Sequence, residues 1–315
     1  MLKPLVSRHR DAAYAYLTER GLRDIFLASK IHEGALTFPD GAGQGRFLGA
    51  FDGEKLEGVL FLGHGGLVVF SAERPHARRL FAEEAWKERA KIRLLVGEWA
   101  SVSDFWGHLE AAGFVARRDW REVFCEADRA SLSPEREPRL RLAEASDLPV
   151  LVDLSARAYR EETGEDPLAA MGEGYVRHVA RNVEEARTFV LEDSGSRLVF
   201  KADLSARCPA GAQIVGVFTE PELRGRGIAR RCTGEIVHRL LEANGQASGV
   251  SAVCLFVRED NAPARRAYER AGFVPSMTYR RLFVEAVATV PAVTTSNRTG
   301  SNARAKQPAS VKRRS

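Results

Sequence analysis

The residue types best suited to chemistry lie in the run VGVFTEPELRGRGIARRC at positions 215–232. An apolar strand ends at a proline turn, and Arg224, Gly225, Arg226 and Gly227 then lead directly into a long amphipathic helix. The first N–H groups of a helix have no intrahelical partner and carry the positive end of the helix dipole. The two glycines let a bulky anion approach the backbone closely. This run therefore predicts a pyrophosphate-binding loop.

Two other kinds of phosphate loop do not fit this run. A P-loop needs Gly-Lys-Ser/Thr, which is missing, and the dinucleotide fingerprint needs a third glycine where Arg230 stands. The remaining alternative is a basic helix start that faces solvent and binds nothing. A second run further along the chain, LFVREDNAPARRAYERAGF at 255–273, argues against that alternative.

The two runs, found together in this order, resemble the GNAT superfamily, the Gcn5-related N-acetyltransferases. The resemblance covers about 139–287. The segments VFKADL, GVFTEPELRGRGIA and NAPARRAYERAGF look closer still to a bacterial group of GNAT enzymes that carry an N-terminal domain of unknown function. The resemblance implies an α/β fold with a mixed (α+β) sheet, acetyl-CoA as cosubstrate and no metal. It also implies direct transfer of acetyl from the thioester to an amine, without a covalent enzyme intermediate.

The resemblance also implies roles for single residues. The loop from Arg224 through Ile228 to Ala229 would hold the pyrophosphate through its backbone N–H groups. Asn261 would help to hold the cofactor arm, and the phenol of Tyr268 would protonate the leaving thiolate. Without the motif, Asn261 is a helix cap and Tyr268 is a packing residue.

The strand before the loop would carry the pantetheine arm. Its residues Val217, Phe218 and Thr219 would pair their backbone with that arm as an added strand does. For this, the strands that carry 215–219 and 252–257 must separate. A strand N–H, of Phe218 or Thr219, would stabilise the charge that develops on the carbonyl oxygen.

The base that takes the proton of the amine has a weaker sequence signal. The strand AQIVGVFT holds no Asp or Glu before Glu220, so Glu220 is the first candidate. Asp203 and Glu192 are the alternatives, acting through water. As hairpin residues, both are also ordinary solvated carboxylates.

An internal repeat organises the chain. HLEAAGF at 108–114 matches AYERAGF at 267–273, so the offset in numbering is 159 (267 minus 108). Each half orders its elements as hairpin, strand, helix, strand, helix, strand. We therefore expect a tandem GNAT-like acyl-CoA N-acyltransferase fold with a degenerate N-terminal copy. The expected division is 1–127 for the degenerate domain, 128–138 for a linker, 139–288 for the GNAT domain and 289–315 for a basic disordered tail.

The first half lacks the chemistry of the second. The phosphate loop is replaced by SAERPHARR at 71–79, which has no glycine, and Leu109 stands at the position of Tyr268. We therefore expect that 1–127 does not bind acetyl-CoA. It would shape the acceptor pocket or pack as a pseudo-dimer partner.

Composition limits the remaining functions. The chain has 47 Lys and Arg against 42 Asp and Glu, but six of the basic residues and none of the acids lie in 291–315. The folded body is thus nearly neutral, and we expect no contact with nucleic acid beyond weak binding by the tail. Four cysteines without a C-x-x-C pair and no apolar run of about 20 residues predict a cytoplasmic protein without membrane contact.

Two questions stay open at the sequence level. The amine acceptor and the oligomeric state have no readable signal. The alternative function is a non-catalytic acyl-CoA-binding regulatory module with the same fold.

Overall fold

A computed structural model describes residues 1–37, 45–242 and 249–285. The strands are β1 (Leu2–Pro4), β2 (Gly45–Asp52), β3 (Lys55–Gly63), β4 (Leu67–Ala72), β5 (Leu94–Glu98), β6 (Ala116–Ala127), β7 (Arg141–Leu142), β8 (Thr188–Glu192), β9 (Leu198–Cys208), β10 (Gly211–Thr219), β11 (Val253–Arg258) and β12 (Val274–Val284). The α-helices are α1 (Arg10–Thr18), α2 (Ile25–His32), α3 (Pro75–Lys87), α4 (Trp99–Ala111), α5 (Leu148–Thr163), α6 (Pro167–Met171), α7 (Glu173–Glu184), α8 (Ile228–Glu242) and α9 (Ala262–Ala271).

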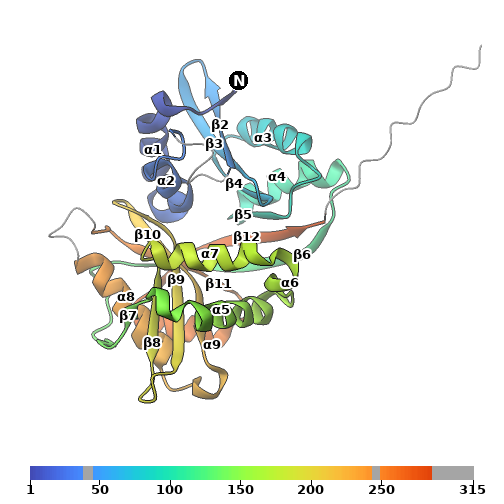
Figure 1. Ribbon diagram of the computed structural model, residues 1–315. Coiled ribbons are helices and arrows are strands. Elements are labelled where there is room, and N and C mark those ends of the chain that lie inside the picture. The colour runs from blue at the N-terminus through green and yellow to red at the C-terminus, as the bar shows by residue number, and fades with distance from the viewer. Residues whose placement is uncertain (38–44, 243–248, 286–315) are drawn as a thin grey trace, which may run out of the picture.

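The twelve strands form one continuous mixed sheet that runs through both halves of the chain (Figure 1). Its order is β1-β2-β3-β4-β5-β12-β6-β11-β10-β9-β8-β7. Two neighbouring pairs are parallel, β4 with β5 and β10 with β11, and all others are antiparallel. The predicted α/β class and the predicted order of elements in each half are confirmed.

The two halves exchange their last strands at the centre of the sheet. β6 ends the first half in sequence, yet it pairs with β11 and β12. β12 ends the second half and pairs with β5. In the β6–β12 ladder Arg121 lies opposite Arg280, and their numbers again differ by 159 (280 minus 121). That separation equals the offset of the sequence repeat, so a pseudo-twofold axis passes between these two arginines.

Helices cover both faces of the sheet. On one face, α3 and α4 pack on the first half and α8 and α9 on the second. On the other face, which we call the acceptor face, α1 and α2 lie over the centre of the sheet and α5 and α7 over β8 to β10 (Figure 1). The four cysteines are buried free thiols.

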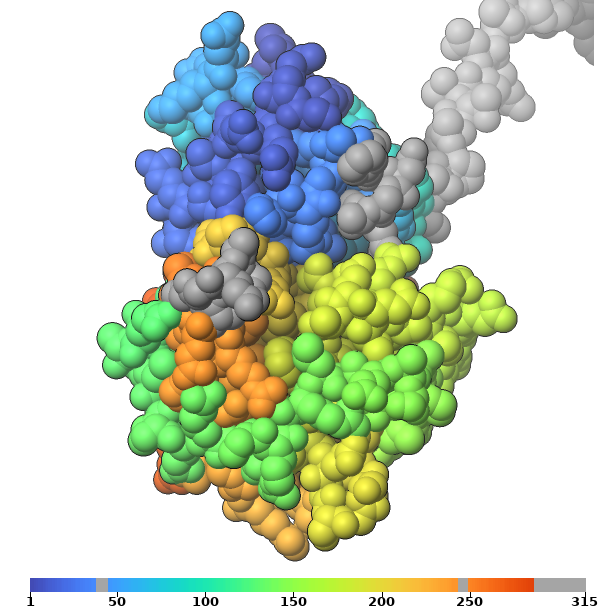
Figure 2. All heavy atoms as spheres, turned by 60° about the vertical axis from the view of Figure 1, so that its left-hand side comes forward, coloured from blue at the N-terminus to red at the C-terminus, as the bar shows by residue number. Residues whose placement is uncertain are grey.

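Helix α2 belongs to the first half and docks on a strand of the second. The hydroxyl of Ser29 donates to the carbonyl of Arg207 and accepts from its N–H, at 3.2 and 2.9 Å. Glu33 at the end of the helix pairs with Arg187 at 2.7 Å. In Figure 2 the blue N-terminal lobe rests on the golden end of β9. With the strand exchange, these contacts make the first half a structural part of the second.

The predicted linker, 128–138, has no helix or strand but is held against α8. Arg136 bonds both Glu235 and Glu242, and the side chain of Glu137 is buried beside Arg231. The predicted tail, 289–315, lies outside the described residues. Within those residues, no helix combines the length and apolarity needed to cross a bilayer.

Candidate active site

The strands β10 and β11 separate as the resemblance implies. They pair only from Ala212 to Ile214 on β10 and from Val253 to Leu255 on β11. Beyond Ile214 and Leu255 the two strands no longer pair with each other. We call the resulting opening the fork. It leaves the backbone of 215–219 unpaired on the side of β11, which is the arrangement that an added extended chain requires.

A β-bulge shapes the β10 side of the fork. The register with β9 shifts between Val215 and Phe218, and Gly216 has φ of +59°. A Cβ at Gly216 would lie 3.0 Å from the carboxylate of Asp203, so the bend needs a glycine. Beyond the bulge Phe218 pairs with Lys201, and the N–H of Glu220 bonds the carbonyl of Val199 at 3.0 Å.

This register decides which strand N–H can act in the fork. N–H groups alternate between the two sides of a strand. Since Phe218 and Glu220 face β9, the N–H of Thr219 faces the fork. Of the two donors predicted for the carbonyl oxygen, Thr219 therefore has the suitable orientation and Phe218 does not. The hydroxyl of Thr219 is also buried without a hydrogen-bond partner among the described residues.

The glycine loop leaves its backbone donors open. The N–H groups from Gly225 to Arg230 bond no atom in the described part of the chain, whereas that of Arg224 already bonds the carbonyl of Pro221 at 3.3 Å. Gly225 and Gly227 have φ of +78° and +74°, the left-handed conformation that favours glycine. The run of unbonded N–H groups thus begins one residue later than the predicted loop 224–229 and continues into the first turn of α8.

Most arginines of the loop are engaged with carboxylates. Arg224 forms a two-point ion pair with Glu161 of α5, at 2.6 and 2.8 Å. Arg230 and Arg231 pair with carboxylates of the 128–138 segment. The exposed side chain of Arg226 has no ion-pair partner among the described residues and is the cation most available to a ligand.

The equivalent turn of the first half is closed. Helix α3 starts with Pro75, which has no N–H, and the N–H groups of Ala77 and Arg78 both bond the carbonyl of Arg74. The guanidinium of Arg78 folds back onto the carbonyls of Ala72 and Glu73 and pairs with Asp104. This observation supports the expectation that the first half binds no acetyl-CoA.

Asn261 lies just beyond β11 and caps α9. Its side chain accepts from the N–H of Ala264 at 3.2 Å, which is the capping role that the sequence also allowed. The residue is exposed beside the fork. Its side-chain N–H₂ group has no partner among the described residues.

Tyr268 projects from α9 into the core beside the fork. It is 8 % exposed and packs edge-on against Phe273 at 6.1 Å. Its hydroxyl bonds no atom of the described residues. Burial, followed by the charges of Glu162 and Cys125, raises the pKa of Tyr268 above its usual value. The phenol is therefore protonated at neutral pH, as a proton donor must be.

The three predicted bases are all engaged. Glu220 is buried in a two-point ion pair with Arg157 of α5, at 2.7 and 2.9 Å. Asp203 accepts from Lys201 and from Thr188. Glu192 pairs with Arg141 at the outer edge of the sheet. Arg157 and Arg224 both also lie over the ring of Phe218, so these contacts fix the end of β10 and the start of the loop.

One carboxylate missed by the sequence analysis is free. Glu162, at the end of α5, is exposed and has no ion pair or hydrogen bond within the described chain. Its charge acts on groups of two other elements around the fork, since it helps to raise the pKa of Tyr268 on α9 and of Glu122 on β6, each after the larger effect of burial. No local motif marks Glu162, because only the docking of α5 on the acceptor face brings it here.

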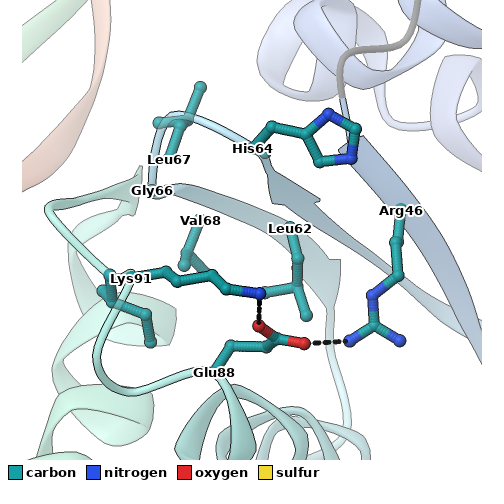
Figure 3. Close-up of a pocket in the computed structure, with 10 residues that line it drawn as sticks. Arg46, Leu62, His64, Gly66, Leu67, Val68, Glu88 and Lys91 are labelled. Carbon is teal, nitrogen blue, oxygen red and sulfur yellow. Dashed lines mark hydrogen bonds and ion pairs between the residues drawn. The ribbon is translucent and has the colours of Figure 1, made fainter. Parts of the chain in front are cut away.

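The described residues also line two cavities. One, of about 150 Å³, opens between the β3–β4 turn and the end of α3 (Figure 3). Its Glu88 already accepts from Lys91 at 2.7 Å and from Arg46 at 3.2 Å, so its charges are satisfied. The other, of about 170 Å³, lies on the acceptor face between the halves and contains Asp24.

Asp24 should make folding pH-dependent. Burial raises its pKa to about 6, against the opposing effect of Ser71 and Arg20. This pKa is higher than the unfolded value of about 3.9. The contribution of Asp24 to the stability of the native state is therefore fully present below about pH 3.9 and is lost as the pH rises through 6. Relative to Asp24→Asn, the native protein should lose about 1 kcal/mol of unfolding free energy between about pH 5 and pH 8. Urea unfolding of both proteins measures this, and a pH-independent difference would contradict it.

The comparisons with known proteins agree with this geometry. A family model described as Acetyltransferase (GNAT) family matches residues 118–273, from β6 to the end of the α9 turn. These residues form a GNAT acetyltransferase domain. No curated protein matches the sequence closely enough to count as a relative.

Solved structures share the fold over nearly the whole chain. A GNAT acetyltransferase from Colwellia psychrerythraea has 12% identity and a TM-score of 0.54, covering 90% of this chain and 100% of its own. A tandem GNAT protein from the clavulanic acid biosynthesis pathway has 15% identity and a TM-score of 0.54, covering 92% of this chain and 99% of its own. A GCN5-related N-acetyltransferase from Sphaerobacter thermophilus has 16% identity and a TM-score of 0.53, covering 90% of this chain and 94% of its own. At these identities the likeness establishes the tandem fold alone.

Proposed function

We propose that the C-terminal half is an acetyl-CoA-dependent N-acetyltransferase. The observation that carries the proposal is the set of unbonded N–H groups from Gly225 to Arg230, at the end of a strand that separates from its neighbour. This set suits a pyrophosphate, and the fork suits the extended pantetheine. Residues Val217 and Thr219 would pair with that arm, and Asn261 would bond it from the other side.

The two faces of the sheet supply the two proton steps. The acetyl group comes from the thioester. The amine nitrogen bonds the acetyl carbon as the carbon–sulfur bond breaks, while the N–H of Thr219 stabilises the carbonyl oxygen. Tyr268 gives its proton to the thiolate on the α9 side. Glu162 takes the proton of the amine on the acceptor face, directly or through one water.

Glu220 then acts as a positioning residue. Its ion pair with Arg157 occupies the oxygens that a base would use, but it also ties the end of β10 to α5. Glu161, one turn further along α5, ties down Arg224 in the same way. Together these pairs hold Thr219 and the glycine loop in line.

The alternative, a non-catalytic acyl-CoA-binding module, has one observation in its favour. All three bases predicted from the sequence are engaged in ion pairs or hydrogen bonds. The alternative leaves the buried phenol of Tyr268 without a role.

The glycine loop gives the direct test. Ala at position 227 disfavours the left-handed backbone by about 1–2 kcal/mol, and its Cβ would lie 3.3 Å from nitrogens of Arg230 and Arg231. The loop should relax so that its N–H groups no longer converge. We expect Gly227→Ala to weaken acetyl-CoA binding about tenfold by calorimetric titration.

The control is Gly53→Ala in the β2–β3 turn. Gly53 has φ of +58° and open space around it, so the same change should leave acetyl-CoA affinity unaltered. The whole chain is required, because β6 lies between strands of the other half. The native protein should bind one acetyl-CoA per chain. A second equivalent would contradict the assignment of the first half, and no binding would exclude the proposed function.

A further inference from the structure

The cavity between the halves is built from both copies of the repeat. It lies on the acceptor face, bounded by β4 and β5 of the first half and by β9, β10 and β11 of the second. Val215 and Phe256 are part of its wall on the second half, together with Arg281 and Tyr279 of β12. The first two directly follow Ile214 and Leu255, the last pair before β10 and β11 separate. The cavity therefore opens beside the fork, on the face where Glu162 stands.

Unsatisfied polar atoms in the wall of the cavity are hydrogen-bond donors. Nε of Arg23 and the hydroxyl of Ser205 are buried without a hydrogen-bond partner among the described residues, whereas Nε of Arg20 lies within ion-pair distance of Asp24 and Glu73, at 3.8 and 3.4 Å. Arg281 bonds Glu122 only through its Nε, at 3.0 Å, so its two outer nitrogens have no hydrogen-bond partner in the described chain. A guanidinium has donors and no acceptor. The group that satisfies this wall is an anion, and a carboxylate matches the guanidinium fork.

The carboxylates in the wall are less available to a ligand. Asp24 accepts from Ser71 at 2.6 Å, and Glu98 lies 3.9 Å from Arg23. This pattern disfavours a polycationic acceptor, which would need free acids.

The rest of the cavity is apolar and large enough for a ring. Phe26, Phe70, Val96 and Phe256 contribute its hydrophobic surface. An apolar cavity of about 150 Å³ in another protein binds benzene. A volume of about 170 Å³ thus accommodates a phenyl or branched aliphatic group.

We propose that this cavity binds the acceptor, and that the acceptor is an α-amino acid with an apolar side chain. The carboxylate lies on Arg281 and Arg23, the side chain lies among the aromatic residues, and the amine points to the fork. This inference rests on the proposed acetyltransferase function. It also gives the degenerate half a task, since that half supplies Arg23 and most of the apolar wall.

Binding without chemistry tests the proposal. L-phenylalanine, L-leucine and L-methionine are compared with 2-phenylethylamine and 3-methylbutylamine, which lack the carboxylate, by ligand-observed NMR on the full chain. At least one amino acid should bind at millimolar concentration. It should bind about tenfold to a hundredfold more tightly than its decarboxylated counterpart, as expected for a charge-assisted contact.

Two variants locate the site. Arg281→Gln alone would leave Glu122 buried and unpaired, so the double variant Glu122→Gln/Arg281→Gln removes both charges together. It should weaken binding of the amino acid about tenfold or more and leave binding of the amine unchanged. Val96→Phe, which fills the cavity from the first half, should weaken both. Arg46→Gln, in the cavity of Figure 3, is the control and should change neither.

Three results would overturn the inference: no binding by any of the three amino acids, equal binding of acid and amine, or binding unchanged in both cavity variants. Acetyl-CoA titration of the same samples distinguishes a failure of the proposed acceptor class from a failure of the proposed acetyltransferase function. A chain that binds acetyl-CoA but no amino acid refutes only the acceptor class. A chain that binds no acetyl-CoA refutes the proposed function itself.

Discussion

Tyr268→Phe should lower kcat about a hundredfold while changing the acetyl-CoA dissociation constant less than about threefold. The change removes only the hydroxyl, and the ring keeps its contact with Phe273. Since that hydroxyl has no partner among the described residues, its loss should not lower the melting temperature. Release of free thiol from acetyl-CoA in the presence of an amine measures kcat, and calorimetric titration measures binding.

Tyr175→Phe is the matched control for this prediction. Tyr175 is also buried, and burial followed by the charge of Asp203 raises its pKa, but it lies on α7 away from the loop and α9. Its variant should retain native kcat. If Tyr268→Phe also retained native kcat with a good acceptor, the phenol would have no chemical role, and the non-catalytic module would become the better description.

Much of the fold could be predicted from local sequence, for a physical reason. Strand alternation, the glycine turns and the match of HLEAAGF with AYERAGF all lie in short stretches of chain, and each half repeats them in order. The exchange of β6 and β12 is different. Both strands can complete either half, and which partner each takes depends on packing across the whole sheet. The sequence contains the offset of the repeat, but only the ladder shows Arg121 opposite Arg280.

The candidate site divides along the same line. The glycine loop, the separation of the strands and the cap at Asn261 follow from backbone rules that the local sequence obeys. The choice of base does not, because acids from several elements lie on the same half of the sheet. Glu220 is adjacent to β10 in sequence but meets Arg157, whereas Glu162 comes from a helix much earlier in the chain and meets no cation among the described residues. Whether a carboxylate is free is decided by tertiary pairing.

Glu162→Gln should lower kcat/KM about a hundredfold at neutral pH, with acetyl-CoA affinity unchanged. Gln keeps the shape of the side chain but cannot accept a proton. The amine would then have to enter already neutral, so the deficit should shrink as the pH rises toward the pKa of the acceptor amine. A residue that only supports the fold would give a deficit independent of pH.

Glu165→Gln makes the same change just beyond the end of α5, where the carboxylate lies 3.6 Å from Arg117. It should leave kcat/KM and its pH profile as in the native protein. If Glu162→Gln also kept the native pH profile, the proton of the amine would pass to solvent and Glu162 would not be the base. The acceptor would then have to enter the fork as a neutral amine, and Tyr268 alone of the two residues would take part in proton transfer.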